Sequence, residues 1–385
     1  MTGRRETQQS TTSAWPWRPG NEFGFLDDGA RFFARMLESI GTARAYVLLE
    51  MYLVTSGIIA TRFVTALVQA RARGVRVCAL FDGFGALGLK RADRGRLLAA
   101  GVELRFFNPL QLRNRLRNFR RDHRKLLLVD GQLAFVGGAG LADEFAAGTA
   151  GEPPWREIML QIAGPVVADW QRAFADTWRR CGEELALAVS PPPVALADGA
   201  SGRLALSEAR QRSALANDVL RRLYAAGERA WVMSAYFVPS RRFRQALRRA
   251  ARRGVDVRLL VPGARTDHPW VRQAARRFYG KLLRNGVRIF EYQPRMLHAK
   301  MILCDEWVSI GSSNLDRWSF RWNLEANQEI ADRRVSDAAA ALFVADFAAS
   351  MELSRRYWRE RAWLDRRREN IAGVLDRWLD RWRWP

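Results

Sequence analysis

The sequence is short of histidine, lysine and cysteine, and it contains no long apolar run. Among 385 residues there are three histidines and three cysteines. The cysteines, Cys78, Cys181 and Cys304, are odd in number and lack the spacing of a metal site, so neither a disulfide framework nor a zinc site is expected. Cys78 and Cys304 lie in apolar, strand-like stretches, which favours buried thiols in a reducing compartment.

No stretch approaches the roughly 20 apolar residues that a membrane-spanning helix needs. The most apolar run, residues 45–54, is short and contains Glu50. Residues 1–20 lack the apolar core of a secretory signal and are predicted to be disordered. We therefore expect the chain to be soluble or bound to a membrane surface, without a transmembrane helix.

Lysine is scarce although the chain is strongly basic. The formal net charge is +23, yet only four of the 63 Lys and Arg residues are lysine. Such a charge attracts a polyanion, either nucleic acid or an anionic membrane surface. Two of the four lysines and two of the three histidines fall in one repeated motif. Because lysine is a compact point charge and arginine a planar fork, the motif indicates a site that needs a point charge beside an imidazole.

The motif has the form His-x-Lys-x4-Asp, and its two copies begin 298 − 123 = 175 positions apart. The residues that define the copies are His123, Lys125 and Asp130, then His298, Lys300 and Asp305. Attack on a phosphodiester builds negative charge, which two lysines can stabilise. One neutral imidazole can form a phosphohistidine while the other, protonated, serves the leaving oxygen. An ordinary histidine pKa lies near neutrality and suits both tasks. This chemistry needs no metal or cofactor, and no metal-ligand pattern is apparent.

A glycine-rich turn follows each copy of the motif, and the two turns differ. The first has the sequence GGAG and the second GSSN. The second supplies an amide, Asn314, that can help to stabilise the phosphate charge, whereas the first has Gly140 there. Ser312 and its counterpart Gly138 are assigned supporting roles in the same turns.

Glu157 and Glu325 follow the two motifs at comparable places, each entering a strand-like run. A catalytic imidazole needs a partner that fixes its tautomer and orientation. We predict that these carboxylates provide it; ordinary surface carboxylates are the alternative interpretation. Glu325 and Asn314 are assigned to the half of the site that contains His298.

The rest of the chain repeats around the motifs. RGVRVCALFD (73–82) matches RGVDVRLLVP (253–262), and GVELRFFNP (101–109) matches GVRIFEYQP (286–294). Strands alternate with helices in both halves, which predicts an α/β fold with a mixed sheet flanked by helices in each repeat. A loop with five arginines precedes the first motif, at 110–122, and is predicted to form a basic flap.

We divide the chain into five parts, with the stretch SPPPVALADGASG marking a linker. The parts are a disordered N-terminus (1–20), repeat 1 (21–189), the linker (190–203), repeat 2 (204–351) and a C-terminal helix (352–385). The last part contains five tryptophans and has one apolar and one basic face. Such a helix suits the interface of a membrane, and docking on the protein's own core is the equal alternative.

The paired motifs resemble the signature of the phospholipase D superfamily, and the second half is most similar to bacterial cardiolipin synthases. The resemblance implies two repeats related by a pseudo-two-fold axis, with the active site between them. It implies transfer of a phosphatidyl group from one phospholipid, such as phosphatidylglycerol, to a hydroxyl of another through a phosphohistidine. It also implies that His123 is the nucleophile and His298 the acid and base.

The expected partners are anionic phospholipids and the membrane surface, on the cytoplasmic face of the bacterial inner membrane, with no nucleic acid. Three alternatives stay open. A hydrolytic phospholipase D would use water as acceptor, a nuclease or other phosphodiesterase would use the positive charge, and a membrane-binding scaffold would need no chemistry. A nuclease predicts a basic groove with stacking aromatics, whereas here tryptophans concentrate in the C-terminal stretch.

Three further residues belong to stretches that the family shares. Asp130 and Asp305 are grouped with the catalytic residues as members of the motif, although a carboxylate that caps the turn at the end of a strand is a sufficient explanation for them. His268 lies between Asp267 and Pro269, which are interpreted as the cap and first turn of a helix. A substrate-binding role for His268 at the rim of the site is the other hypothesis.

Overall fold

The computed structural model confirms the α/β class. It describes residues 15–111, 117–146, 148–149, 151–187, 193–208, 214–316 and 322–361. Repeat 1 begins with a strand, and its first helix starts after Asp28, whose carboxylate accepts a hydrogen bond from the Ala30 amide. The elements of this half are β1 (Arg18–Leu26), α1 (Gly29–Thr42), β2 (Tyr46–Met51), α2 (Ile58–Ala72), β3 (Arg76–Asp82), α3 (Arg91–Ala99), β4 (Glu103–Phe107), η1 (Arg117–Phe119), β5 (Arg121–Asp122), β6 (Lys125–Val129), β7 (Leu133–Gly137), η2 (Asp143–Phe145), β8 (Met159–Ala163) and α4 (Val167–Arg179).

Repeat 2 restarts the same order after the linker. Its elements are β9 (Ala200–Ser207), α5 (Ala214–Ala225), β10 (Arg229–Met233), α6 (Arg241–Arg252), β11 (Asp256–Pro262), α7 (Pro269–Arg276), α8 (Tyr279–Arg284), β12 (Arg288–Tyr292), β13 (Met301–Cys304), β14 (Trp307–Gly311), β15 (Asn323–Ala331), α10 (Arg333–Ala348), β16 (Ser350–Glu352) and α11 (Arg355–Glu360). Two consecutive helices, α7 and α8, connect β11 to β12.

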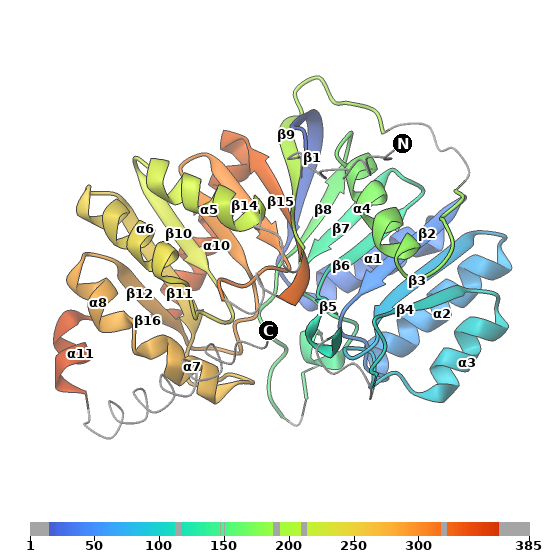
Figure 1. Cartoon of the computed structure of the whole chain (residues 1–385), viewed down its shortest axis with the longest axis horizontal. Coiled ribbons are helices and arrows are strands. Elements are labelled where there is room, and N and C mark those ends of the chain that lie inside the picture. Colours follow the sequence, from blue (N-terminus) through green and yellow to red (C-terminus); the bar gives the residue numbers. More distant parts are fainter. Residues whose placement is uncertain are drawn as a thin grey trace, which may run out of the picture.

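Within the described residues, the strands of both repeats form one continuous 16-stranded sheet. Its order is β16-β12-β11-β10-β13-β14-β15-β9-β1-β8-β7-β6-β2-β3-β4, with β5 paired to β15. Counted outward from the central pair β9 and β1, equivalent strands of the two repeats follow one another in the same order. This arrangement confirms two repeats related by a pseudo-two-fold axis. Figure 1 shows the two halves on either side of β1 and β9, each with its own helices.

Alternating side chains of the strands build separate cores on the two faces of the sheet. In β2, Val47 and Leu49 pack in the core of α1, α2 and α3, whereas Leu48 faces the opposite side. On that opposite side, one core runs across both repeats and contains Trp170 of α4 and Phe343 of α10. This shared core holds the two halves in a fixed relation, which the site between them requires.

Two predicted boundaries at the centre of the sheet are wrong. β1 begins at Arg18, inside the stretch predicted to be disordered, and it pairs with both β8 and β9. β9 runs from Ala200 to Ser207, across the predicted boundary between the linker and repeat 2. Both segments contain glycine and polar residues, so their sequence lacks the apolar pattern that predicts a strand. They join the sheet through backbone hydrogen bonds.

The C-terminal helix predicted at 352–385 is only partly covered by the described residues. β16 ends at Glu352 and α11 spans Arg355–Glu360, so the described part is not one continuous helix. Trp358 of α11 is buried, and its ring lies 5.4 Å from that of Tyr279, centroid to centroid. This tryptophan therefore docks on the protein's own core. Residues 362–385, with the other four tryptophans, lie outside the described residues.

Candidate active site

The two motif histidines are each held by the opposite repeat. The backbone amide of His123 donates to the carbonyl oxygen of Leu324 at 3.0 Å, and that of His298 donates to the carbonyl oxygen of Arg156 at 2.8 Å. Short parallel pairings accompany these bonds, between β5 and β15 in one case and between Arg156 and Leu297 in the other. The two copies of the motif therefore meet across the pseudo-two-fold axis.

The two imidazoles are oriented by buried glutamates from the opposite repeat. Nδ1 of His123 lies 3.0 Å from Oε2 of Glu325, and Nδ1 of His298 lies 2.6 Å from Oε2 of Glu157. Because an ionised carboxylate only accepts, each Nδ1 carries the proton and donates, which leaves a lone pair on Nε2. The assignment of Glu325 to the half-site of His298 is therefore wrong, since Glu325 holds His123.

Each lysine folds back onto the histidine of its own motif. Nζ of Lys125 donates to the carbonyl oxygen of His123 at 2.5 Å. Nζ of Lys300 donates to the carbonyl oxygen of His298 and lies 3.2 Å from its Nε2. Burial lowers the pKa of Lys125 to about 7 and also lowers the pKa of Lys300. The site thus concentrates two amines in a poorly solvated environment, where an anion is the natural counter-charge.

The imidazoles are neutral in the substrate-free site. Burial, followed by the charge of Lys300, lowers the pKa of His298 to about 4, although Glu157 opposes the shift. Burial also lowers the pKa of His123, against the raising effect of Glu325. The expectation of a pKa near neutrality is therefore wrong for His298. Both imidazoles begin as bases or nucleophiles.

Aromatic side chains that the sequence analysis did not select enclose the histidines. The ring of Tyr52 lies 4.7 Å from that of His123, and its counterpart Tyr236 lies 6.1 Å from His298, between centroids. Trp155 of repeat 1 also packs against His298, at 5.2 Å. The sequence could have identified these tyrosines, because both occupy the same position of two matching segments, MYLV and AYFV.

The glycine-rich turns support the glutamates in different ways. The Ser312 hydroxyl donates to Oε2 of Glu325 at 2.5 Å. At the matching position, a Cβ on Gly138 would lie 2.2 Å from Oε2 of Glu157, so only glycine lets this carboxylate approach. Asn314 is buried, and its Oδ1 has no hydrogen-bond partner among the described residues. This oxygen can accept a hydrogen bond from a ligand, whereas only the Nδ2 group of the same amide can donate to a phosphate.

Replacing Gly140 by asparagine is expected to lower the melting temperature rather than to restore a missing amide. A Cβ at this position would lie 2.7 Å from both Cβ and the carbonyl oxygen of Leu53, so the backbone must shift, at a cost of about 1–3 kcal/mol. Gly227→Asn is the matched control, because a Cβ at Gly227 meets no atom within 4 Å. Equal melting temperatures for the two variants in thermal unfolding would contradict this prediction.

The motif aspartates do not lie beside the histidines. Each aspartate comes directly after the strand that its motif begins. At about 3.3 Å per residue, this strand carries the chain roughly 16 Å away from the motif lysine. Both aspartates have a positive φ, 52° for Asp130 and 50° for Asp305. Their carboxylates accept backbone hydrogen bonds from the amides of Arg44, Ala45 and Tyr46, and of Gly227, Glu228 and Arg229. Grouping them with the catalytic residues is therefore not supported; they anchor the starts of β2 and β10.

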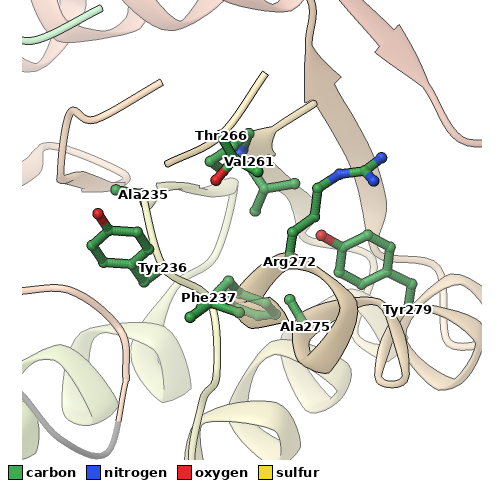
Figure 2. Close-up of a pocket in the computed structure, with 10 residues that line it drawn as sticks. Ala235, Tyr236, Phe237, Val261, Thr266, Arg272, Ala275 and Tyr279 are labelled. Carbon is green, nitrogen blue, oxygen red and sulfur yellow. The ribbon is translucent and has the colours of Figure 1, made fainter. Parts of the chain in front are cut away.

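His268 lies at the edge of the site, with 61% of its side chain exposed. Its ring lies 5.4 Å from that of Tyr236, whose hydroxyl donates to Asp267. Asp267 is therefore not the helix cap that we predicted; α7 begins at Pro269 directly after His268. A small pocket adjoins Tyr236 and is lined mainly by apolar side chains (Figure 2).

The described part of the basic loop is held by both repeats, because β5 pairs with β15 of repeat 2 and Arg121 contacts repeat 1. Arg121 is buried, donates to the carbonyl oxygen of Asn108 at 2.9 Å and lies 3.5 Å from Asp82. This arginine therefore has a structural role and does not belong to a flap. Residues 112–116 lie outside the described residues.

In the described part of the chain, no three His, Cys, Asp or Glu side chains are grouped to hold a metal, and every helix is too short or too polar to cross a membrane.

Comparison with known proteins places the chain in a family. A family model described as "Cardiolipin synthase, PLD-like domain" matches residues 36–178 and 219–347. The chain belongs to this family. Cardiolipin synthase A of Pseudomonas putida (strain W619) is 35% identical over 353 residues, which cover 88% of this chain and 71% of that protein. Cardiolipin synthase B of Salmonella typhimurium is 35% identical over 341 residues, covering 82% and 78%. As a member of the cardiolipin synthase family, the chain is a phosphatidyltransferase enzyme.

Two solved structures share the fold at low sequence identity. The phosphatidylserine synthase of Haemophilus influenzae Rd KW20 superposes with a TM-score of 0.70 at 13% identity, covering 93% of each chain. The polyphosphate kinase of Porphyromonas gingivalis gives a TM-score of 0.54 at 14% identity, covering 83% of this chain and 49% of the other. At these low identities, the two structures show only that the fold is shared.

Proposed function

We propose that the protein is a cardiolipin synthase-type phosphatidyltransferase that uses phosphatidylglycerol as donor and as acceptor. The observation that carries the proposal is the crossed pairing of two histidines with two buried glutamates, beside two lysines, at the junction of the repeats. The proposal includes peripheral attachment to anionic lipid on the cytoplasmic face of the bacterial inner membrane.

In the first step, Nε2 of His123 attacks the donor phosphorus. The P–O bond to the terminal glycerol breaks, a P–N bond forms, and His298 gives the leaving oxygen its proton, so glycerol departs. Lys125, Lys300 and Asn314 stabilise the negative charge of the phosphoryl oxygens. The side chain of His123 is 14% exposed and that of His298 is 9% exposed, which agrees with His123 as the more accessible nucleophile.

His298 must gain a proton before it can act as an acid. In the free site its pKa is lowered to about 4, first by burial and then by Lys300. A phosphodiester anion bound between the lysines opposes the charge of Lys300 and raises the pKa of His298. Substrate binding therefore brings the proton to the imidazole that must donate it.

In the second step, the hydroxyl of a second phosphatidylglycerol enters and gives its proton to His298. Its oxygen attacks phosphorus, the P–N bond to His123 breaks, and cardiolipin is released. Water in place of the lipid hydroxyl would give phosphatidic acid. Trp155 and Tyr236 enclose His298 and favour exclusion of water. We assign the exposed His268, beside Tyr236, to the headgroup of the acceptor.

Purified protein with labelled phosphatidylglycerol tests this proposal. Cardiolipin and glycerol are the expected products. Phosphatidic acid would identify a hydrolytic phospholipase D. No lipid turnover, together with cutting of single-stranded DNA, would identify a nuclease and overturn the lipid assignment. Binding to lipid without any turnover would identify a scaffold.

The pH dependence of kcat/KM is expected to report Lys125. Because its pKa in the free enzyme is lowered to about 7, raising the pH above 7 removes a charge that attracts the phosphodiester, and kcat/KM falls. Lys125→Arg keeps its charge, so we expect a plateau roughly ten-fold lower that does not fall near pH 7. The exposed Lys281, replaced by arginine, should leave the profile unchanged. An alkaline fall that persists unaltered in Lys125→Arg would contradict the assignment.

A further inference from the structure

Exposed apolar side chains gather on one edge of repeat 1. Ile58, Phe84 and Leu87 are 61%, 50% and 64% exposed, and Leu110 is 49% exposed. They lie in the connections that follow β2, β3 and β4, three neighbouring parallel strands. Because parallel strands have their carboxyl ends at one edge of a sheet, the four side chains share that edge. We call these four residues the apolar edge.

The apolar edge is also the edge of the active site. Lys125 pairs with Met51, the last residue of β2, so His123 lies just beyond the carboxyl end of that strand. On the other side of the site, Trp270 lies in the first turn of α7, after β11, and is 69% exposed. Exposed apolar groups therefore flank the site from both repeats.

The connections that carry the apolar edge are tied together. The Gly83 amide donates to the carbonyl oxygen of Phe107 at 2.8 Å, and the Ser56 amide donates to the carbonyl oxygen of Gly88 at 3.0 Å. The apolar side chains are thus presented by an ordered platform rather than by single loops. Exposed apolar side chains that share one edge of an ordered platform are typical of an interaction site.

The charges beside the apolar edge favour an anionic partner. Lys90 and Arg91 are exposed directly after Leu87, and the whole chain has a formal net charge of +23. Apolar side chains with flanking cations match the interface of an anionic bilayer, where acyl chains lie beneath negatively charged headgroups. A polyanion without an apolar layer, such as nucleic acid, would leave the four apolar side chains unused.

We propose that the apolar edge is the membrane-docking surface, inserted into the interfacial layer of an anionic phospholipid leaflet. The inference rests on the proposed function, in which donor and acceptor are both lipids. Both must then reach His123 and His298 from the same leaflet, which a site opening at the inserted edge allows. Neither lipid has to expose its acyl chains to water on the way.

Sedimentation with sucrose-loaded vesicles of phosphatidylglycerol tests the surface. The variant Phe84→Ser/Leu87→Ser removes the centre of the apolar edge, and we expect at least about ten-fold weaker vesicle binding. The matched control is Leu98→Ser/Val344→Ser, which removes two apolar side chains of similar exposure, 50% and 53%, from the far end of α3 and from α10. The control should bind within about two-fold of the unmodified protein. Circular dichroism verifies that both variants fold.

Several outcomes would overturn the proposal. They are failure of the unmodified protein to bind these vesicles, unchanged binding of the apolar-edge variant, or an equal loss in the control. A dimer that dissociates only in the apolar-edge variant would instead make the edge an interface between two copies. Turnover of short-chain phosphatidylglycerol in detergent tests the proposed function separately from the docking surface. Its absence refutes the proposed function, whereas turnover that survives in a variant with weakened vesicle binding supports both.

Discussion

Replacing His123 by alanine is expected to reduce phosphatidyl transfer by at least about 10⁴-fold, the largest effect of any single substitution considered. Glu325 holds the imidazole through Nδ1. In the proposed mechanism Nε2 is the nucleophile, so alanine removes the atom that would accept the phosphatidyl group. The measurement is the rate of cardiolipin formation from phosphatidylglycerol in detergent micelles, so that membrane attachment does not enter. His268→Ala, at the exposed third histidine, is the comparison: because we assign this side chain to the acceptor headgroup, we expect a higher KM for the acceptor while transfer stays measurable.

A substrate with a good leaving group distinguishes the roles of the two histidines. A phosphatidyl ester of p-nitrophenol needs no proton on its leaving oxygen, so His298→Ala should still release a burst of p-nitrophenol and accumulate a phosphatidyl-enzyme. His123→Ala should give no burst. A burst from His123→Ala, with none from His298→Ala, would transfer the nucleophilic role to His298.

Replacing Glu325 by glutamine is expected to lower kcat by about 10²–10⁴-fold, as loss of a tautomer-setting carboxylate does elsewhere. Glu325 is fully buried and holds Nδ1 of His123, and Ser312 holds the carboxylate in turn. A neutral amide no longer stabilises the charged imidazole adduct or enforces the proton on Nδ1. The substitution should reduce the p-nitrophenol burst, because the burst measures the step that depends on His123.

Two matched glutamates control the Glu325 experiment. Glu329 lies on the same strand and is equally buried, but it pairs with Arg203, so Glu329→Gln should lower stability and leave the burst intact. Glu157→Gln acts on His298 and should slow turnover with natural lipid more than the burst. A burst lost in Glu157→Gln and kept in Glu325→Gln would contradict the crossed pairing.

The different support of the two glutamates gives the halves of the site unequal properties. Glu325 receives hydrogen bonds from Ser312 and from Asn323, at 2.5 Å and 3.1 Å, in addition to His123. Glu157 faces Gly138 and lies 3.7 Å from Nζ of Lys300. Neutral side chains thus donate to Glu325, whereas Glu157 accepts from the backbone amide of Ile158 at 2.9 Å and has the Lys300 ammonium close by. This asymmetry agrees with different duties for the two histidines.

Local pattern was enough for the element order and for the chemistry of the motifs. Nearly continuous apolar runs along β2 and β3, and helical spacing in α1, depend on neighbouring residues and can be recognised in one sequence. The concentration of lysine and histidine in two repeated segments identified four residues that the structure brings to the junction of the repeats. Tyr52 and Tyr236 were missed although the repeat contains them, because tyrosine in a strand is ordinary.

Only the tertiary structure decided which groups meet. Glu325 follows the second motif in the chain but lies 3.0 Å from the histidine of the first, because the two-fold arrangement exchanges partners between repeats. Burial, which no local pattern records, then lowered the pKa of His298 to about 4 and that of Lys125 to about 7. The central strands β1 and β9 likewise depend on backbone pairing across the chain. The sequence by itself determined the reactive groups, and long-range contacts determined their pairing and their charge.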